Sequence, residues 1–333
     1  MAKAAQQYLK RLEGRFQRAR LAAGRASFSN FGEERIVRKY VAELLPEGAS
    51  RTAVDIGAGD GVRGSNTYAL FRAGWRGVGF EGSNRKVCKL AAAYKHYPAV
   101  SAANCIVTPS NVVPLLKAYD IEREFGVLSL DIDSYDYWVL DAVLAEFRPR
   151  LVVTEINEKI PPPIRFVVNY DPSFQMTHHF FGYSIASLAD LAARHDYAIL
   201  EVEYNNAFLA PRELPNVRPL DPADAYRRGY VERPDRREKF RANANMEILH
   251  TLKPAEAVKF LDEFYARHRG KYELSAGDTA SDTMGYAASD TAGGTVSDTA
   301  GDTAGDANAA HRSPAETHAR PDESPARETT ARG

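Results

Sequence analysis

The sequence predicts an α/β fold in which helices cover both faces of a mostly parallel β-sheet. Three observations lead to this prediction. Short apolar segments alternate with amphipathic ones, a glycine-rich turn follows the first apolar segment, and two strand-like segments close the series. Regular strand–helix alternation implies crossover connections, which make successive strands parallel. The closing pair predicts a hairpin that adds an antiparallel strand at the edge of the sheet.

The elements of the first half follow from apolar periodicity. Residues 31–45 place their apolar side chains at helical spacing and predict the first helix. Short apolar runs predict five buried strands, at 52–57, 76–82, 100–108, 125–133 and 150–157. Amphipathic segments between them predict helices at 66–74, 84–95 and 136–147.

A long irregular insertion, residues 158–182, follows the fifth strand. Its three consecutive prolines, 161–163, are incompatible with a helix interior or a central strand. Loops longer than about 12–15 residues in compact domains are usually functional or disordered. We therefore expect this insertion to form a substrate lid.

The remaining elements lie between residues 184 and 274. Residues 184–195 predict a helix capped by Ser184. Residues 197–211 predict two strands joined at Asn205-Asn206, residues that tolerate left-handed turn geometry. Residues 222–270 are basic and predict helices. The chain therefore divides into an N-terminal helical segment (1–45), an α/β domain (46–215), a helical C-terminal extension (216–274) and a tail (275–333).

The tail differs from the rest of the chain in composition. It repeats Asp-Thr-Ala among small residues, which predicts a disordered segment because too little apolar surface is available to offset the entropy of ordering. Of the 44 acidic and 43 basic residues of the chain, ten and four lie in 275–333. The 34 acidic and 39 basic residues that remain give residues 1–274 a net charge of about +5. This basic body would suit an anionic or phosphorylated substrate, or would simply be a solvated surface.

Composition also limits which kinds of binding partner and which cellular compartment we expect. The overall charge of −1 does not indicate a nucleic-acid-binding protein. Cys88 and Cys105 have no C-x-x-C spacing, which predicts neither a zinc site nor a redox dithiol. The chain shows no signal-peptide pattern and no apolar run of about 18 residues, so we expect a cytoplasmic protein with no membrane partner. The sequence leaves a homo-oligomer open.

The turn after the first strand gives the main indication of a ligand. Residues 55–61 have the pattern D-x-G-x-G-x-G, in which glycines let a ligand approach the backbone. The dinucleotide pattern G-x-G-x-x-G would require glycine at Val62. Asp55 is awkward beside a pyrophosphate but suits a cationic group, such as the methionine end of S-adenosylmethionine (SAM). Glu81, at the end of the second strand, could bind ribose hydroxyls. A tight strand–helix connection without a ligand is the alternative.

Together these residues resemble class I SAM-dependent methyltransferases, and within them the FkbM-like group. The resembling stretches cover about residues 28–210: "FSNFGEERIV" (28–37), "VDIGAGDG" (54–61), "GWRGVGFEGS" (74–83), "LSLDIDSYDYWVL" (128–140), "RPRLVVTEIN" (148–157) and "NNAFL" (205–209). The first-strand motif is common to all class I methyltransferases, whereas two signatures are narrower: "SNT" (65–67) followed by "GW", "G" and "EG" within 74–82, and "DIDSYDYWVL" (131–140). Members of the group often have D-x-E-G after the fourth strand, whereas this chain has D-I-D-S at 131–134.

The resemblance implies a Rossmann-like sheet of seven strands with an antiparallel last strand, and SAM as cofactor. It implies that Glu81 binds the ribose and that the segment at Asp131 lines the active site and the cofactor. The residues that would hold the methionine end are Asp55, Gly57, Gly59 and Asp60. The residues that would lie near the adenine are Gly82, Ser83, Asn104 and Cys105.

Acidic residues end the fourth and fifth predicted strands. Ligands of open α/β sheets bind outside the carboxyl ends of the strands, where Asp131, Asp133 and Glu155 fall. Asp131 or Asp133 could serve as general base for a hydroxyl acceptor. The three acids could instead hold Mg²⁺ or Mn²⁺. Asp133 could also be no more than a helix cap.

His178 and His179, in the insertion, could join the acids as catalytic base or metal ligand, or be ordinary loop residues beside Phe180 and Phe181. The sequence thus predicts a SAM-dependent methyltransferase acting on a hydroxyl of a small molecule or glycan. One alternative is an NAD-dependent oxidoreductase or epimerase on a similar sheet. The other is a scaffold protein that has kept the fold and lost catalysis.

Overall fold

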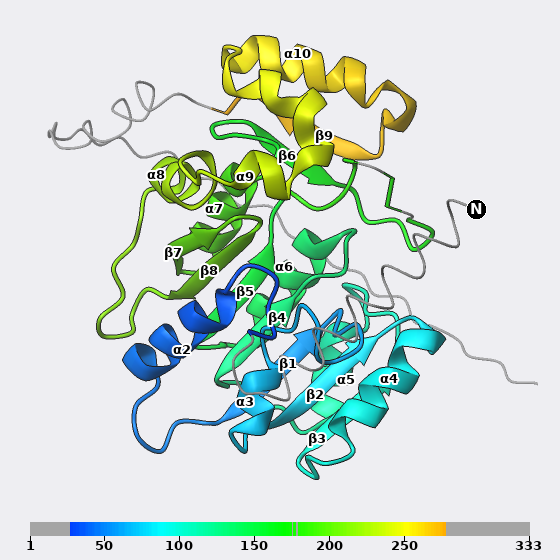
Figure 1. The fold of residues 1–333 in the computed structure, drawn as a ribbon, viewed down its shortest axis with the longest axis vertical. Coiled ribbons are helices and arrows are strands. Elements are labelled where there is room, and N and C mark those ends of the chain that lie inside the picture. The colour runs from blue at the N-terminus through cyan, green and yellow to red at the C-terminus, as the bar shows by residue number, and fades with distance from the viewer. Residues whose placement is uncertain (1–26, 175, 178, 278–333) are drawn as a thin grey trace, which may run out of the picture. The chain divides into compact units, whose positions relative to one another are not determined.

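The computed structural model describes residues 27–174, 176–177 and 179–277 (Figure 1). A seven-stranded sheet with the order β3-β2-β1-β4-β5-β8-β7 forms its centre. Its strands are β1 (Thr52–Ile56), β2 (Arg76–Glu81), β3 (Val100–Asn104), β4 (Val127–Leu130), β5 (Leu151–Glu155), β7 (Tyr197–Glu203) and β8 (Asn206–Pro211). β1 to β5 pair in parallel, and β8 pairs antiparallel with both β5 and β7. The predicted Rossmann-like fold with an antiparallel last strand is confirmed.

The expectation that the antiparallel strand forms the edge is wrong. β8 lies between β5 and β7, and β7 takes the edge. All six residues of β8 and six of the seven residues of β7 are buried, so the apolar pattern of the hairpin does not distinguish the inner strand from the edge strand. The connecting turn also differs, because Tyr204 adopts the left-handed conformation with φ 54° and Asn206 already belongs to β8.

Helices cover both faces of this sheet and follow the predicted order. They are α2 (Glu33–Leu44), α3 (Tyr68–Arg72), α4 (Asn84–Tyr94), α5 (Val112–Ala118), α6 (Asp136–Glu146) and α7 (Ile185–Arg194). α2, α3 and α4 bury apolar residues in one core cluster, and α5, α6 and α7 in another. The sequence analysis missed α5, which contains Pro114 in its first turn, a position where proline is tolerated. Ser184 caps α7 as predicted, accepting the Ser187 N–H.

A second, two-stranded sheet was not foreseen. β6 (Arg165–Val168) lies within the predicted lid and pairs antiparallel with β9 (Tyr272–Ser275). The C-terminal extension between them contains α8 (Pro222–Tyr226), the π-helix η1 (Arg227–Val231), α9 (Arg236–Lys239), η2 (Arg241–His250), α10 (Pro254–Phe264) and η3 (Ala266–His268). Ile160, Ile164 and Phe166 are buried, so much of the 158–182 insertion belongs to the core.

Two predicted segments fall largely beyond the described residues: 1–26 of the N-terminal segment, and the tail except for 275–277. Within the described ranges, no helix combines the length and apolarity needed to cross a membrane.

Candidate functional site

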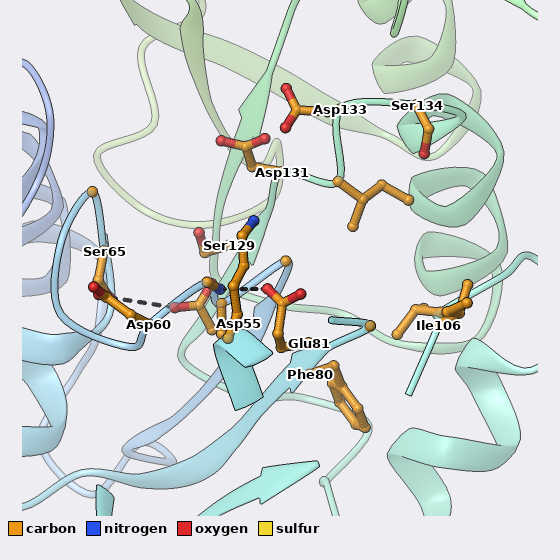
Figure 2. Close-up of a pocket in the computed structure, with 18 of the residues that line it drawn as sticks. Asp55, Asp60, Ser65, Phe80, Glu81, Ile106, Ser129, Asp131, Asp133 and Ser134 are labelled. Carbon is orange, nitrogen blue, oxygen red and sulfur yellow. Dashed lines mark hydrogen bonds between the residues drawn. The ribbon is translucent and has the colours of Figure 1, made fainter. Parts of the chain in front are cut away.

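A cavity of about 840 Å³ opens at the carboxyl ends of β1, β2 and β4 (Figure 2). It is lined by the glycine turn after β1, the end of β2, the loop after β3, the loop after β4, and residues of α4 and the insertion. Open α/β sheets bind their ligands at this position. The cavity is therefore the candidate active site.

Gly57 allows the glycine turn to pass directly beneath the loop after β4. Its φ is 89°, and a Cβ built there would lie 1.7 Å from the carbonyl oxygen of Asp131. No other residue fits such a close approach without moving the backbone. Gly59, two residues later, donates its N–H to Glu81 at 2.9 Å. The turn thereby links the ends of β1, β2 and β4 around one cavity.

Glu81 is held by backbone groups while it lines the cavity. Its Oε2 accepts the Gly59 N–H, and its Oε1 accepts the Ser83 N–H at 2.7 Å. Each carboxylate oxygen keeps further acceptor capacity for a ligand hydroxyl. Ser83 itself does not line the cavity, and its hydroxyl instead caps α4 by accepting the Lys86 N–H.

Asp55 and Asn66 place two hydrogen-bond acceptors at the cavity. Asp55 accepts hydrogen bonds from Thr67 at 2.6 Å and Ser65 at 3.4 Å, and burial raises its pKa to about 6. Asn66 donates to Ser129 at 3.4 Å, but its Oδ1 is buried with no partner among the described residues. A buried acceptor without a partner is costly. These two groups therefore fit a ligand that brings a cationic donor, such as an ammonium group.

The other predicted cofactor residues fall into two groups. Gly82 and Cys105 line the cavity, as does Asp60, whose carboxylate accepts from Arg63 Nε and two backbone N–H groups. The hydrogen bonds that the Asp60 carboxylate accepts from within the turn, including the ion pair with Arg63, therefore stabilise the turn itself. Asn104 does not line the cavity, because its amide donates to Asn84 at 2.5 Å.

Ile106, which the sequence analysis missed, supplies an apolar surface in this cavity. Its side chain is 64% exposed although it is large and apolar. It lines the same cavity as Phe80 and Glu81 (Figure 2). An exposed apolar side chain next to a ribose-binding candidate is suited to contact a flat base. A single isoleucine in a loop gives no such signal in the sequence.

The structure brings the three predicted acids together. Asp131, Asp133 and Glu155 each offer a carboxylate oxygen within 4.8 Å of the other two. Figure 2 shows the Asp131 and Asp133 carboxylates close to each other above the glycine turn. Burial, followed by repulsion from Asp133, raises the pKa of Asp131 to about 7. Burial and the neighbouring Asp131 raise the pKa of Glu155 well above its ordinary value.

The loop after β4 owes its shape to Asp136, a residue that the sequence analysis missed. Asp136 accepts the N–H groups of Ile132 at 2.8 Å and Ser134 at 2.9 Å. Asp133 is left-handed, with φ 56°, and does not cap α6, whose N-cap is Tyr135. The alternative that Asp133 is only a helix cap is therefore wrong.

Cations lie near the acid cluster. Burial raises the pKa of Asp133, and the charges of Lys86 and Lys159 oppose that shift. Lys159 is buried and donates to Glu158 at 3.0 Å. Asn205 donates to Glu155 Oε1 at 2.7 Å. The repulsion among the three acids is thus offset by raised pKa values, by two lysines and by an amide.

His179 is not brought to the acid cluster. It is buried outside the cavity lining, and its Nε2 lies 3.0 Å from Asn245 Oδ1. Its carbonyl accepts hydrogen bonds from Asn157 and Tyr265. Phe264, at the end of α10, lies 5.8 Å from the His179 ring, centroid to centroid, so this residue packs against α10 and not in the cavity. His178 lies outside the described residues. Among the described residues of the insertion, Pro172, Phe174 and Met176 line the cavity.

Comparison with known proteins adds limited information. No family model and no curated protein matches the chain. Among solved structures, a TehB-like SAM-dependent methyltransferase from Corynebacterium glutamicum is 13% identical over 63% of this chain and 100% of that chain, with a TM-score of 0.35. A SAM-dependent methyltransferase from Clostridium acetobutylicum is 10% identical over 60% and 99%, with a TM-score of 0.36. The [4+2]-cyclase SpnF is 15% identical over 75% and 82%, with a TM-score of 0.36. Scores this low carry no functional argument, so function must be argued from the cavity.

Proposed function

We propose that this chain is a SAM-dependent methyltransferase that methylates a hydroxyl group of a small molecule or glycan. The observation that carries the proposal is the set of acceptors in the cavity. Asp55 and the Oδ1 of Asn66, which has no partner in the described part of the chain, suit the ammonium group of SAM. Glu81, fixed by Gly59 and Ser83, suits the ribose hydroxyls, and Ile106 suits the adenine.

The region after the glycine turn disfavours the NAD-dependent alternative. Dinucleotide folds place a helix N-terminus directly after the glycines, so that backbone N–H groups bind the pyrophosphate. In this chain the next helix, α3, begins only at Tyr68, seven residues after Gly61. The carboxylate of Asp55 would also repel a pyrophosphate. The cavity therefore suits a cofactor that carries a cationic amino-acid group.

The acid cluster supplies the proton acceptor of the proposed reaction. SAM, when bound, supplies a methyl group on a sulfonium. Asp131 or Asp133 takes the proton of the acceptor hydroxyl, whose oxygen then forms the new bond to that methyl group. Asp136 holds the loop that carries both acids, and Asn205 orients Glu155 beside them. The products are S-adenosylhomocysteine (SAH) and a methyl ether.

A divalent cation is the alternative role for the cluster. Three carboxylates within 4.8 Å fit the oxygen donors that Mg²⁺ or Mn²⁺ prefers. Asp131, Asp133 and Glu155 would hold the ion, which would lower the pKa of the acceptor hydroxyl. Lys86 and Lys159 already place positive charge near Asp133. We therefore favour the metal-free base.

Calorimetry with SAH and NAD on the full chain tests the cofactor. We expect SAH to bind, and Glu81→Ala to weaken its binding by about 1–3 kcal/mol, the cost of a lost buried partner. Glu122→Ala is the control, because Glu122 contacts Ser50, Thr52 and Arg76, outside the cavity lining. Binding of NAD without binding of SAH would exclude the proposal. Labelled SAM with a panel of hydroxylated acceptors then identifies the substrate.

A further inference from the structure

Three cations line the cavity from one face of α4. Lys89 stands four residues after Arg85 and three after Lys86, spacings that bring side chains together on a helix surface, and all three residues line the cavity. All three are exposed. Within the described part of the chain, no side-chain ion pair or hydrogen bond occupies any of them. They thus form a basic face that remains available to a ligand.

This basic face is placed against the ordinary rules of helix stability. Arg85 and Lys86 lie in the first turn of α4, which contains no acidic residue. The positive end of the helix dipole disfavours cations there, and neighbouring like charges repel each other. Elsewhere the chain follows the rule, with Glu33 and Glu34 opening α2. A bound anion would offset both the unfavourable dipole interaction and the repulsion between the cations. The basic face is therefore better explained by ligand binding than by helix stability.

The basic face belongs to the same cavity as the acid cluster. The positive charge of Lys86 favours the charged form of Asp133. The basic face of α4 therefore lies near the loop that carries the proposed base. Ile106, Phe174 and Met176 add apolar surface to the same lining. A ligand could therefore place a hydroxyl beside Asp131 and Asp133 while another part of it reaches α4.

We propose that the acceptor carries a phosphate ester or diphosphate that binds Arg85 and Lys89, with Lys86 between the anion and Asp133. Arginine forms paired hydrogen bonds with phosphate oxygens, and lysine adds a compact charge. This inference rests on the proposed function and deepens it by naming the class of acceptor. Arg85, Lys86 and Lys89 are also part of the excess of basic over acidic residues in 1–274.

The test uses the full chain saturated with SAH. Inorganic pyrophosphate is the probe that is titrated into it. The double variant Arg85→Glu/Lys89→Glu reverses two of the three charges of the basic face and keeps Lys86, whose charge acts on Asp133. Arg85 and Lys89 are both exposed and glutamate is a good helix former, favoured at Arg85 in the first turn, so this variant should fold. Lys95→Glu is the matched control, because Lys95 is exposed at the C-cap of the same helix but lies outside the cavity lining.

We expect calorimetry to show pyrophosphate binding to the SAH-bound wild type, weakened about tenfold or more in the double variant. Lys95→Glu should stay within about twofold of wild type, and SAH affinity should change little in either variant. Equal losses in both variants, unchanged binding in the double variant, or displacement of SAH by pyrophosphate would each overturn the inference. If SAH alone fails to bind the wild type, the proposed function falls as well, whereas failure of pyrophosphate alone removes only the acceptor class.

Discussion

Asp55 combines a structural cost with a proposed binding role. Its pKa rises from 3.8 to about 6 because it is buried, although Thr67 and Ser65 donate hydrogen bonds to it. The folded protein therefore binds more protons than the unfolded chain between about pH 4 and pH 6. The free energy of unfolding contributed by this group falls as the pH rises through that window. Above about pH 6, Asp55 is a buried negative charge, the state in which it would bind the ammonium group of SAM.

Asp55→Asn should separate these two effects. At pH 8 the variant should be more stable than wild type, on the order of 2 kcal/mol in the free energy of unfolding, because it removes the buried charge. Below about pH 4 the gain should vanish. Urea unfolding of both proteins at several pH values measures this difference. The same variant should bind SAH more weakly at pH 8. A stability gain independent of pH would contradict the raised pKa of Asp55.

Asp131 and Asp133 allow the base and the metal to be distinguished. In the metal-free case, methyl transfer should survive EDTA, and Asp133→Asn or Asp131→Asn should lower kcat while SAH affinity stays nearly constant. With a pKa of about 7, an Asp131 base would also make kcat rise as the pH passes through neutrality. If a metal is required, EDTA should abolish activity and magnesium or manganese restore it. Full activity in both variants would exclude the acid cluster from catalysis.

At the scale of elements, β9 anchors the insertion that borders the cavity. Its residues 272–275 pair with β6, and Tyr272 and Leu274 pack against the core. Gly277 lies over Pro163, where a Cβ would approach the carbonyl oxygen at 2.1 Å. The folded body therefore extends a few residues beyond Leu274, where the composition of the sequence suggested its end.

A pair of truncations tests this anchoring. A chain ending at Gly277 retains β9 and should melt within about 2 °C of the full chain, since the residues removed have little apolar surface. A chain ending at Gly270 loses β9 and should be destabilised by several kcal/mol, roughly 1.5–3 kcal/mol for each large apolar side chain exposed. Thermal melts of both proteins measure the difference. Equal melting temperatures would show that β9 does not stabilise the insertion.

The elements that sequence patterns predict best are those defined by local periodicity. The strands β1 to β5 and the helices α2, α4, α6 and α7 follow apolar spacing within a residue or a few of their predicted bounds. The insertion of β8 between β5 and β7 could not be read locally, because a hairpin pattern does not specify which strand meets the sheet. The β6–β9 pair joins segments about a hundred residues apart, which no local pattern reveals. The contacts of His179 with Asn245 and Tyr265 are long-range in the same way.

The candidate site divides in the same way. Asp131, Asp133 and Glu155 could be predicted to meet because parallel strands end at one edge of the sheet. Asn66, Asp136 and Ile106 could not be singled out, since their importance depends on burial or exposure in the folded chain.

At the scale of the whole described chain, the C-terminal extension supports the site from outside. Asn243 of η2 donates to Glu158 at 2.6 Å, and Tyr226 of α8 donates to the Glu158 carbonyl at 2.6 Å. Glu158 in turn holds Lys159, whose charge acts on Asp133. The segment that appeared in the sequence only as basic and helical thus fixes a cation near the proposed base.

Ligand-dependent melting of the full chain tests the proposal on the whole molecule. A ligand that binds only the folded state at 100 times its Kd adds about 2.7 kcal/mol to the free energy of unfolding. For an ordered body of this size, that corresponds to a rise in Tm of about 5–10 °C. We expect SAH to produce this rise and NAD at the same concentration to produce none. Glu81→Ala, if it weakens SAH tenfold, should remove about 1.4 kcal/mol, or roughly half of the shift. A rise with NAD, or an undiminished SAH shift in Glu81→Ala, would mean that the acceptors in this cavity serve a different ligand.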